Sequence, residues 1–256
     1  MASSHVMVVE NAEAVAHAAL RLFVSAAEKS VADRGSFSVA LAGGGTPRKL
    51  YQLLAKGPAT QPREWPFDWA KVFIFFGDER CVPPDHPDSN FGMAEAELLS
   101  KVPIPKANVF RMRGEIDPNE AAKEYGLMLK ERFGDGGLDL ALLGMGGDGH
   151  TASLFPHTEA VKETKHRCIA HFVENSTTGR SWRITLTVPF LNQSAEVLIL
   201  VDGSSKAQAL KEVLDGPRDP ERLPIQLIQP AGKVIWIVDE EANALRNKAV
   251  PPDHRI

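Results

Sequence analysis

The chain has 256 residues, of which 43% are apolar and 24% are charged, and its formal net charge is −4. These ordinary values for a globular protein exclude a disordered chain, and the sequence lacks the run of about 18 apolar residues that would span a bilayer. Because nucleic acid and anionic membranes attract basic surfaces, the acidic balance argues against both as partners. Any bound anion must therefore be held by a local group of residues.

The cysteine count and the N-terminal sequence bear on the cellular compartment. Cys81 and Cys168 are too few for a disulfide framework and fit no zinc-binding spacing, so we expect buried free thiols in a reducing compartment. The first 14 residues, MASSHVMVVENAEA, lack the basic region and long apolar run of a secretory signal. We expect a cytoplasmic protein. A chain of this length could form one large or two small domains, and the lack of a linker favours one domain over 1–256.

The predicted elements alternate along the chain. A helix is expected over 12–33, where apolar residues recur every three or four positions without Gly or Pro. Short apolar or β-branched runs predict strands at 36–42, 71–76, 138–144, 183–188, 196–201 and 233–238. Further helical patterns lie at 47–56, 91–100, 118–133 and 205–214. This alternation predicts an α/β fold with a single doubly wound, mainly parallel sheet and helices on both faces.

Ligands of such sheets bind beyond the carboxyl ends of the strands, and the first unusual loop there is rich in glycine. Gly43, Gly44, Gly45 and Thr46 lie between the strand at 36–42 and the next helix. Glycines let the backbone approach a ligand closely, Thr46 could cap the helix, and the helix N-terminus attracts anions. The loop could hold a phosphate group. A tight strand-to-helix turn explains the glycines equally well.

The second loop follows the strand at 71–76 and carries three charged residues in a row, Asp78, Glu79 and Arg80. This is a dense polar cluster where a plain turn would need only Gly or Asn. Arg80 could donate to a phosphate or to a developing oxyanion. The alternative is a group of surface ion pairs, which are frequent in proteins.

The third loop, after the strand at 138–144, has the sequence GMGGDGHT and contains Asp148 and His150. Its four glycines favour turns that present both side chains at the sheet edge. A neutral histidine can take a proton from water near pH 7, so His150 is the best general-base candidate in the chain. A metal site is the weaker alternative, because no third ligand lies at a suitable spacing.

Three basic residues complete the candidate site. Arg180 and Arg183 lie just before or at the start of the strand at 183–188, and Lys206 lies at the start of the helix at 205–214. The helix dipole disfavours a lysine at this end unless the lysine serves an anion. An ordinary solvent-exposed lysine remains the alternative. We expect the other histidines to be structural or on the surface, with His86 and His157 as the first exceptions to consider.

The motifs together resemble those of the 6-phosphogluconolactonase family over essentially the whole chain. They read LAGGGTPRKLY, FGDERCVPPDHPDSN, LLGMGGDGHTASLFP and RITLTVPFLN, in this order. The loop more often reads Ser-Gly-Gly-Ser-Thr-Pro in that family, and here Ala42 and Gly45 replace the serines. The resemblance implies a Rossmann-like fold of the deaminase and lactonase type.

A related family, the glucosamine-6-phosphate deaminases, shares several of these motifs. Their Asp-Gly-His triplet is followed by a segment ending in a glutamate that assists ring opening, and Phe155 occupies that place here. Arg80 likewise stands where the deaminases carry an aromatic side chain. Because a phenyl ring cannot transfer protons, the resemblance favours the lactonases. A deaminase-like isomerase and a non-catalytic sugar-phosphate-binding regulator are the alternatives.

The resemblance implies hydrolysis of 6-phospho-D-glucono-1,5-lactone without a metal or organic cofactor. The substrate phosphate would bind the backbone of Gly44 to Thr46 together with Arg183 and Lys206. His150 would activate a water molecule, and Arg80 would stabilise the oxyanion. Asp148 and Asp78 would position the histidine or a substrate hydroxyl. We expect the phosphorylated lactone as the only partner, and a monomer or weak homo-oligomer.

Overall fold

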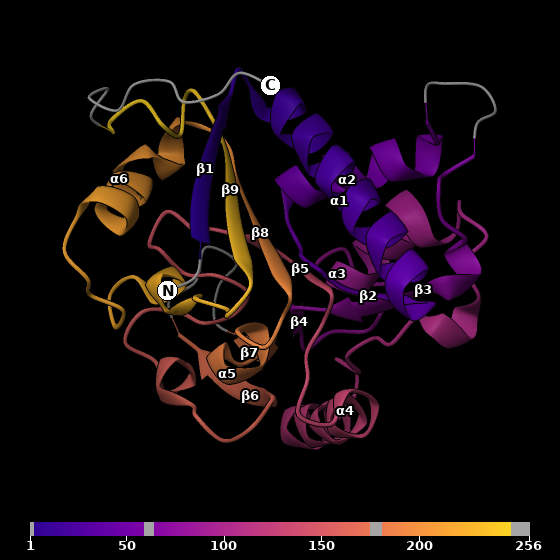
Figure 1. The fold of residues 1–256 in the computed structure, drawn as a ribbon. Helices are drawn as coiled ribbons and strands as arrows, with labels where there is room; N and C mark the ends of the chain where they lie inside the picture. The colour runs from indigo at the N-terminus through magenta and orange to yellow at the C-terminus, as the bar shows by residue number, and fades with distance from the viewer. Residues whose placement is uncertain (1–2, 59–63, 175–180, 247–256) are drawn as a thin grey trace.

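The computed structural model describes residues 3–58, 64–174 and 181–246. Its centre is a six-stranded sheet in the order β1-β9-β8-β5-β2-β3, and every neighbouring pair is parallel (Figure 1). The strands are β1 (Ser3–Val9), β2 (Phe37–Leu41), β3 (Val72–Phe76), β5 (Leu140–Gly144), β8 (Glu196–Val201) and β9 (Lys233–Asp239). The parallel sheet that the sequence predicts is therefore confirmed.

All the helices except α5, which was not predicted, lie close to their predicted positions. They are α1 (Ala12–Arg34), α2 (Gly45–Lys56), α3 (Asn90–Ala94), α4 (Pro118–Phe133), α5 (Val188–Leu191) and α6 (Ala207–Asp215). The Asn11 side chain caps α1 by accepting from two backbone amides, and Gly35 ends this helix with a left-handed backbone at φ 77°. A π-helical turn, Glu95–Leu99, continues α3 through the rest of the segment predicted as one helix.

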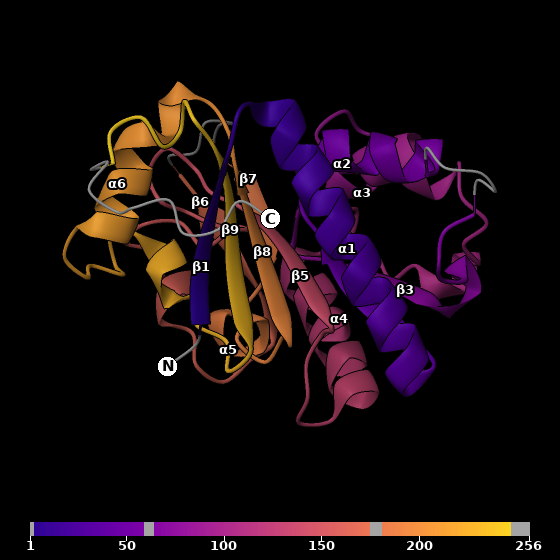
Figure 2. The ribbon, with the colours of Figure 1, turned by 45° about the horizontal axis from the view of Figure 1, so that its top comes forward.

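Helices cover both faces of the sheet, as Figure 2 shows for α1 and α6. Val39 and Leu41 of β2 belong to a buried cluster with α1 and α2, whereas Ala40 belongs to a second cluster with α4, α5 and α6. Alternate residues of one strand thus support two separate cores. Burial of each large apolar side chain contributes about 1.5–3 kcal/mol, so both layers stabilise the same sheet.

A second, three-stranded antiparallel sheet lies beside the main one and corrects the prediction of a single sheet. It has the order β4-β7-β6 and consists of β4 (Asp78–Arg80), β7 (Ser181–Leu186) and β6 (Cys168–Val173). The segment predicted as a strand at 183–188 pairs here and not in the main sheet, where β1 provides the sixth strand. Apolar runs reveal that a strand exists but not which neighbour it pairs with.

The order of the strands determines where a ligand can bind. From β2 the chain continues to its neighbour β3, whereas from β5 it continues, through β6 and β7 of the second sheet, to β8 on the opposite side. The loops that follow β2 and β5 therefore diverge at adjacent strands, and this switch point is where open α/β sheets form a crevice. Among the described residues, no helix has the length and apolar character that crossing a bilayer requires.

Candidate active site

The glycine-rich loop after β2 leads directly into α2. Gly44 is the N-cap residue, with φ 102°, and no side chain caps the helix. Gly44 and Gly45 are exposed, so the first-turn amides lie near solvent at the positive end of the helix dipole. The expectation that Thr46 caps the helix is wrong, because Thr46 lies inside α2 and its hydroxyl donates to the Asp202 carboxylate, beyond the end of β8.

The loops after β2 and β3 are in close contact through Gly43. A Cβ atom at Gly43 would lie only 2.0 Å from the Asn90 side-chain oxygen, so no larger residue fits there. The Asn90 amide in turn donates to the Asp78 backbone oxygen at 2.9 Å and to Asp78 Oδ1 at 3.1 Å. This arrangement fixes the glycine-rich loop beside the charged loop of β4.

Both oxygens of the Asp78 carboxylate are engaged within the protein. Besides the bond from Asn90, Asp78 Oδ2 accepts from the Ser153 hydroxyl at 2.6 Å. The residue is 8% exposed. Asp78 therefore joins three loops, and this geometry favours a positioning role over direct contact with a substrate.

Glu79 is a structural carboxylate. It is 2% exposed and accepts from the backbone amides of Arg80, Asn90 and Phe91 and from the Ser89 hydroxyl. Burial raises the pKa of this carboxyl, although the three amides oppose the shift. Glu79 thereby fixes the start of α3 against β4.

One face of the small sheet presents three basic side chains in a row. Arg80 of β4 lies opposite Arg183 of β7, which lies opposite His171 of β6. Directly opposite residues share one face, so two guanidinium groups are held side by side. Arg183 is 3% exposed, and burial, followed by the charge of Arg80, lowers its pKa.

Arg80 also has a bond that orients it. Its guanidinium donates to the backbone oxygen of Asp88 at 2.5 Å.

Burial lowers the pKa of His171, and the ring nitrogen Nε2 lies 2.6 Å from the Ser153 backbone oxygen. Sequence reasoning treated His171 as structural or on the surface, because it left the strand β6 unassigned. The structure places His171 opposite Arg183, with its ring against the Ser153 backbone oxygen, in agreement with a structural role.

The loop after β5 holds His150 and Asp148 as a pair. His150 Nδ1 lies 2.5 Å from Asp148 Oδ1, and the His150 backbone amide donates to the same oxygen at 3.1 Å. The side chains are 23% and 46% exposed. Burial acts to raise the pKa of Asp148, but the hydrogen bonds from His150 outweigh it and lower that pKa. An Nδ1–H donated to the carboxylate leaves the lone pair of Nε2 for proton transfer.

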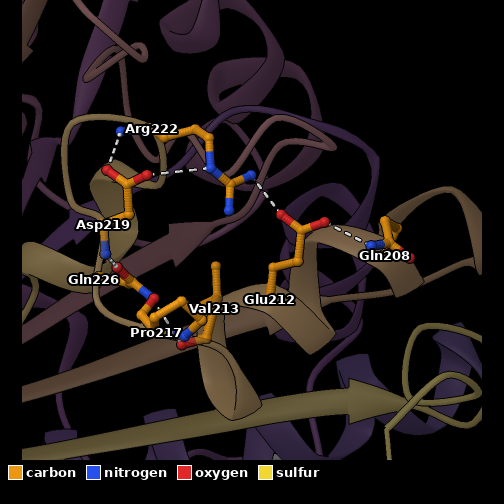
Figure 3. A network of polar contacts seen from close by, with 7 residues as sticks. All are labelled: Gln208, Glu212, Val213, Pro217, Asp219, Arg222 and Gln226. Carbon is orange, nitrogen blue, oxygen red and sulfur yellow. Dashed lines mark hydrogen bonds and ion pairs between the residues drawn. The ribbon is translucent and has the colours of Figure 1, made fainter.

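The segment 217–227 packs against the loop that carries Asp148 and His150. A Cβ atom at Gly149 would lie 2.6 Å from the Leu223 side chain, and the Ile225 amide donates to the Gly149 backbone oxygen at 3.1 Å. Figure 3 shows how the segment is joined to α6: Arg222 forms ion pairs with Glu212 and with Asp219. The Gln226 side chain accepts from the Asp219 amide at 2.7 Å and donates to the backbone oxygens of Val213, in the last turn of α6, and of Pro217, which follows the helix.

Lys206 lies where the loop after β8 meets α6. A Cβ atom at Gly147 would lie 3.3 Å from the Ser205 backbone oxygen, so the two segments are in contact. Lys206 therefore follows a residue that touches the loop carrying Asp148 and His150. Within the described part of the chain, its side chain has no ion pair and no hydrogen bond. Its charge is therefore available to a ligand. Arg180 lies outside the described residues.

The structure thus gathers the predicted loops after β2, β3, β5 and β8 at one end of the sheet. Within the described ranges, no three His, Cys, Asp or Glu side chains cluster as a metal site requires. The thiol of Cys168 is buried and that of Cys81 is partly exposed, and neither forms a disulfide.

Comparison with known proteins gives the family. Residues 10–236 match the family model described as glucosamine-6-phosphate isomerases/6-phosphogluconolactonase. The chain belongs to this family. One member, the 6-phosphogluconolactonase of Synechocystis sp., is 42% identical over 220 residues, which cover 84% of this chain and 86% of that protein.

Solved structures of family members share the fold. The 6-phosphogluconolactonase of Trypanosoma brucei superimposes with a TM-score of 0.82 at 28% identity, over 95% of this chain and 99% of the other. A monomeric glucosamine-6-phosphate deaminase gives a TM-score of 0.81 at 22% identity, over 94% of this chain and all of that one. Because lactonases and deaminases fit the same fold, the fold alone does not distinguish the two activities.

Proposed function

We propose that the chain hydrolyses 6-phospho-D-glucono-1,5-lactone to 6-phospho-D-gluconate, a step of the oxidative pentose phosphate pathway. The observation that carries the proposal is the pair of His150 and Asp148 at the switch point of the sheet, beside a loop with exposed helix-N-terminal amides. The relatives named 6-phosphogluconolactonase support the choice of substrate.

The phosphate would bind where positive charge and backbone amides converge. The amides of Gly45 and Thr46, Arg183 and Lys206 are the proposed ligands, with Gly43 and Gly44 shaping the loop. Arg183 lies beside Arg80, and Lys206 has no protein partner among the described residues. Binding energy from this remote group would hold the lactone carbonyl near His150.

The chemical step would use His150 as a base and then as an acid. Nε2 takes a proton from water while the water oxygen attacks the carbonyl carbon of the lactone. The imidazolium, stabilised by Asp148 at Nδ1, then gives that proton to the ring oxygen as the carbon–oxygen bond breaks. The product carboxyl group ionises to solvent.

Arg80 would stabilise the negative charge that develops on the carbonyl oxygen. Asp78 would act indirectly, because both of its oxygens are already bonded to Asn90 and Ser153. A lactone is already electrophilic, so the proposed route needs no metal or organic cofactor.

The deaminase activity is less favoured, because the position of its glutamate is held by Phe155, which lies against His150.

We also propose that the chain acts as one domain, since both buried clusters share the central sheet. The free thiols support a reducing compartment such as the cytoplasm. A monomer or weak homo-oligomer is the proposed state, which size-exclusion chromatography with light scattering would test.

The first test generates the lactone in place with glucose-6-phosphate dehydrogenase and follows its decay with and without the protein. We expect an acceleration over the spontaneous rate that is lost in His150→Ala, in which kcat falls by roughly 10²–10⁴-fold. Folded protein that gives no acceleration would overturn the lactonase proposal. Ammonia release from glucosamine 6-phosphate would then identify a deaminase, and equilibrium binding of 6-phosphogluconate without turnover would identify a regulator.

A further inference from the structure

We propose that Phe155 is a positioning residue that holds the His150 imidazole in its reactive orientation. The inference deepens the proposed function, because it rests on His150 being the base. The ring centroids of the two residues lie 4.3 Å apart, with 28° between their planes, so the rings are stacked. Phe155 is 7% exposed, whereas 23% of the His150 side chain remains exposed.

His150 needs such a support because it lies on a glycine-rich loop. Among the described residues its ring has one polar anchor, Asp148, which fixes Nδ1 but does not by itself fix the rotation of the ring about that contact. Gly146 lies close to the ring edge, since a Cβ atom there would be 2.1 Å from His150 Nδ1. The stacked phenyl ring restricts the remaining motion and so fixes the direction of Nε2. Misplacement by about 1 Å can cost roughly a hundredfold in rate.

Phe155 can act as a support because it is itself held firmly. Two residues earlier, Ser153 donates its hydroxyl to Asp78 at 2.6 Å and its amide to the Thr185 hydroxyl at 3.2 Å. The Ser153 backbone oxygen lies 2.6 Å from Nε2 of His171, whose ring is 6.5 Å from that of Phe155. The small sheet thereby anchors the segment that carries Phe155, and gives Asp78 and His171 an indirect part in orienting His150.

The stack is also compatible with both protonation states of His150. A phenyl face is electron-rich, and a cation placed over it is attracted to it. The same contact can therefore hold the neutral base and the imidazolium that forms when it takes a proton. An aliphatic side chain of similar bulk would fill the space but lack the flat face.

The kinetic test compares Phe155→Leu, Phe155→Tyr and the control Phe172→Leu in the lactone assay. Phe172 lies in β6 of the small sheet and is 39% exposed. We expect Phe155→Leu to lower kcat about tenfold with KM changed less than about twofold, because the phosphate ligands are intact. The ring-retaining Phe155→Tyr should keep kcat within about twofold, as should the control. A folded Phe155→Leu variant with wild-type kcat would overturn the proposal.

A second measurement does not depend on activity. In the proton NMR spectrum, the His150 Hε1 signal, assigned by its absence in His150→Gln, should be shifted upfield by the Phe155 ring current. It should move towards the free-histidine position in Phe155→Leu and stay upfield in Phe155→Tyr. If Phe155→Leu does not fold, the wild-type signal decides, and one without an upfield shift would overturn the stack.

The two proposals fail in different ways. Full activity in His150→Ala would overturn the proposed base, whatever the NMR spectrum shows. An inactive His150→Ala together with a fully active Phe155→Leu would overturn only the positioning role of Phe155.

Discussion

The loops after β3 and β5 both carry carboxylates at the same end of the sheet, yet their surroundings differ. Glu79 and Asp78 are buried and their oxygens are filled by hydrogen bonds from the protein. Asp148 and His150 are partly exposed and bonded chiefly to each other. A carboxylate with every oxygen occupied holds segments together, whereas an exposed pair has capacity left for a ligand. The first loop therefore has a structural role, whereas the second has groups free to bind a ligand.

Removing the buried carboxylate of Glu79 should give the largest change, a loss of stability. Glu79→Ala removes the acceptor for three backbone amides and a hydroxyl, so we expect unfolding free energy to fall by about 2–4 kcal/mol. Urea denaturation measures the change. The matched control is Glu131→Ala on the exposed surface of α4, which should shift stability by no more than about 0.5 kcal/mol. Equal effects of the two exchanges would contradict the structural role of Glu79.

Lys206, whose side chain has no partner among the described residues, should behave in the opposite way. Lys206→Met is expected to raise KM for the phosphorylated lactone by about 10–100-fold, because a charge-assisted bond to phosphate is lost. Stability should stay within about 0.5 kcal/mol of the wild type. Initial-rate kinetics and urea denaturation check the two parts. Lys211→Met, an exposed residue of the same helix, is the control and should leave KM unchanged.

The partly exposed pair of Asp148 and His150 should make a smaller contribution to stability, and this contribution depends on pH. The lowered pKa of Asp148 means that its ionised form favours the folded state, so this contribution is present above its unfolded pKa of about 4. It is lost as pH falls through the folded value. Between about pH 5 and about pH 3, the wild type should therefore lose more unfolding free energy than Asp148→Asn. Urea midpoints at both pH values measure this, and parallel losses would refute it.

The smallest change in stability is expected at the exposed ion pairs of Arg222 in the segment 217–227. Arg222→Ala removes the bonds to Glu212 and Asp219, but the Gln226 hydrogen bonds and the buried Leu223 remain. The urea midpoint should fall slightly, and the difference should shrink in about 1 M salt, which screens surface charges. A large, salt-independent loss would show that this network matters more than its exposure indicates.

The main sheet was predictable because its strands are nearly continuous apolar runs separated by helices. The second sheet was not. In β6 the apolar run is interrupted by His171, and β4 is only three residues long, so neither has a strong pattern. The strand β1 is not predicted for a different reason: its apolar run at 6–9 is only four residues long and follows the polar residues Ser3, Ser4 and His5.

The site was predictable as a set of loops but not as a set of contacts. The chemistry of Asp148 and His150 follows from residue type and from their position after a strand. The bond between Thr46 and Asp202, and the place of His171 beside Ser153, depend on pairings between distant segments. A single sequence does not contain that information in its local patterns, so it predicts a capping role for Thr46 and no contact for His171.

The divergence of the chain at β2 and β5 affects how a bound ligand stabilises the folded protein in the cell. Segments around positions 45, 150, 183 and 206 meet only after the whole sheet has formed, so a sugar phosphate that needs all of them binds the native chain and no partly folded one. Such a ligand adds about 2.7 kcal/mol to stability at a concentration one hundred times its Kd. Protection from proteolysis would then rise and fall with the concentration of that ligand.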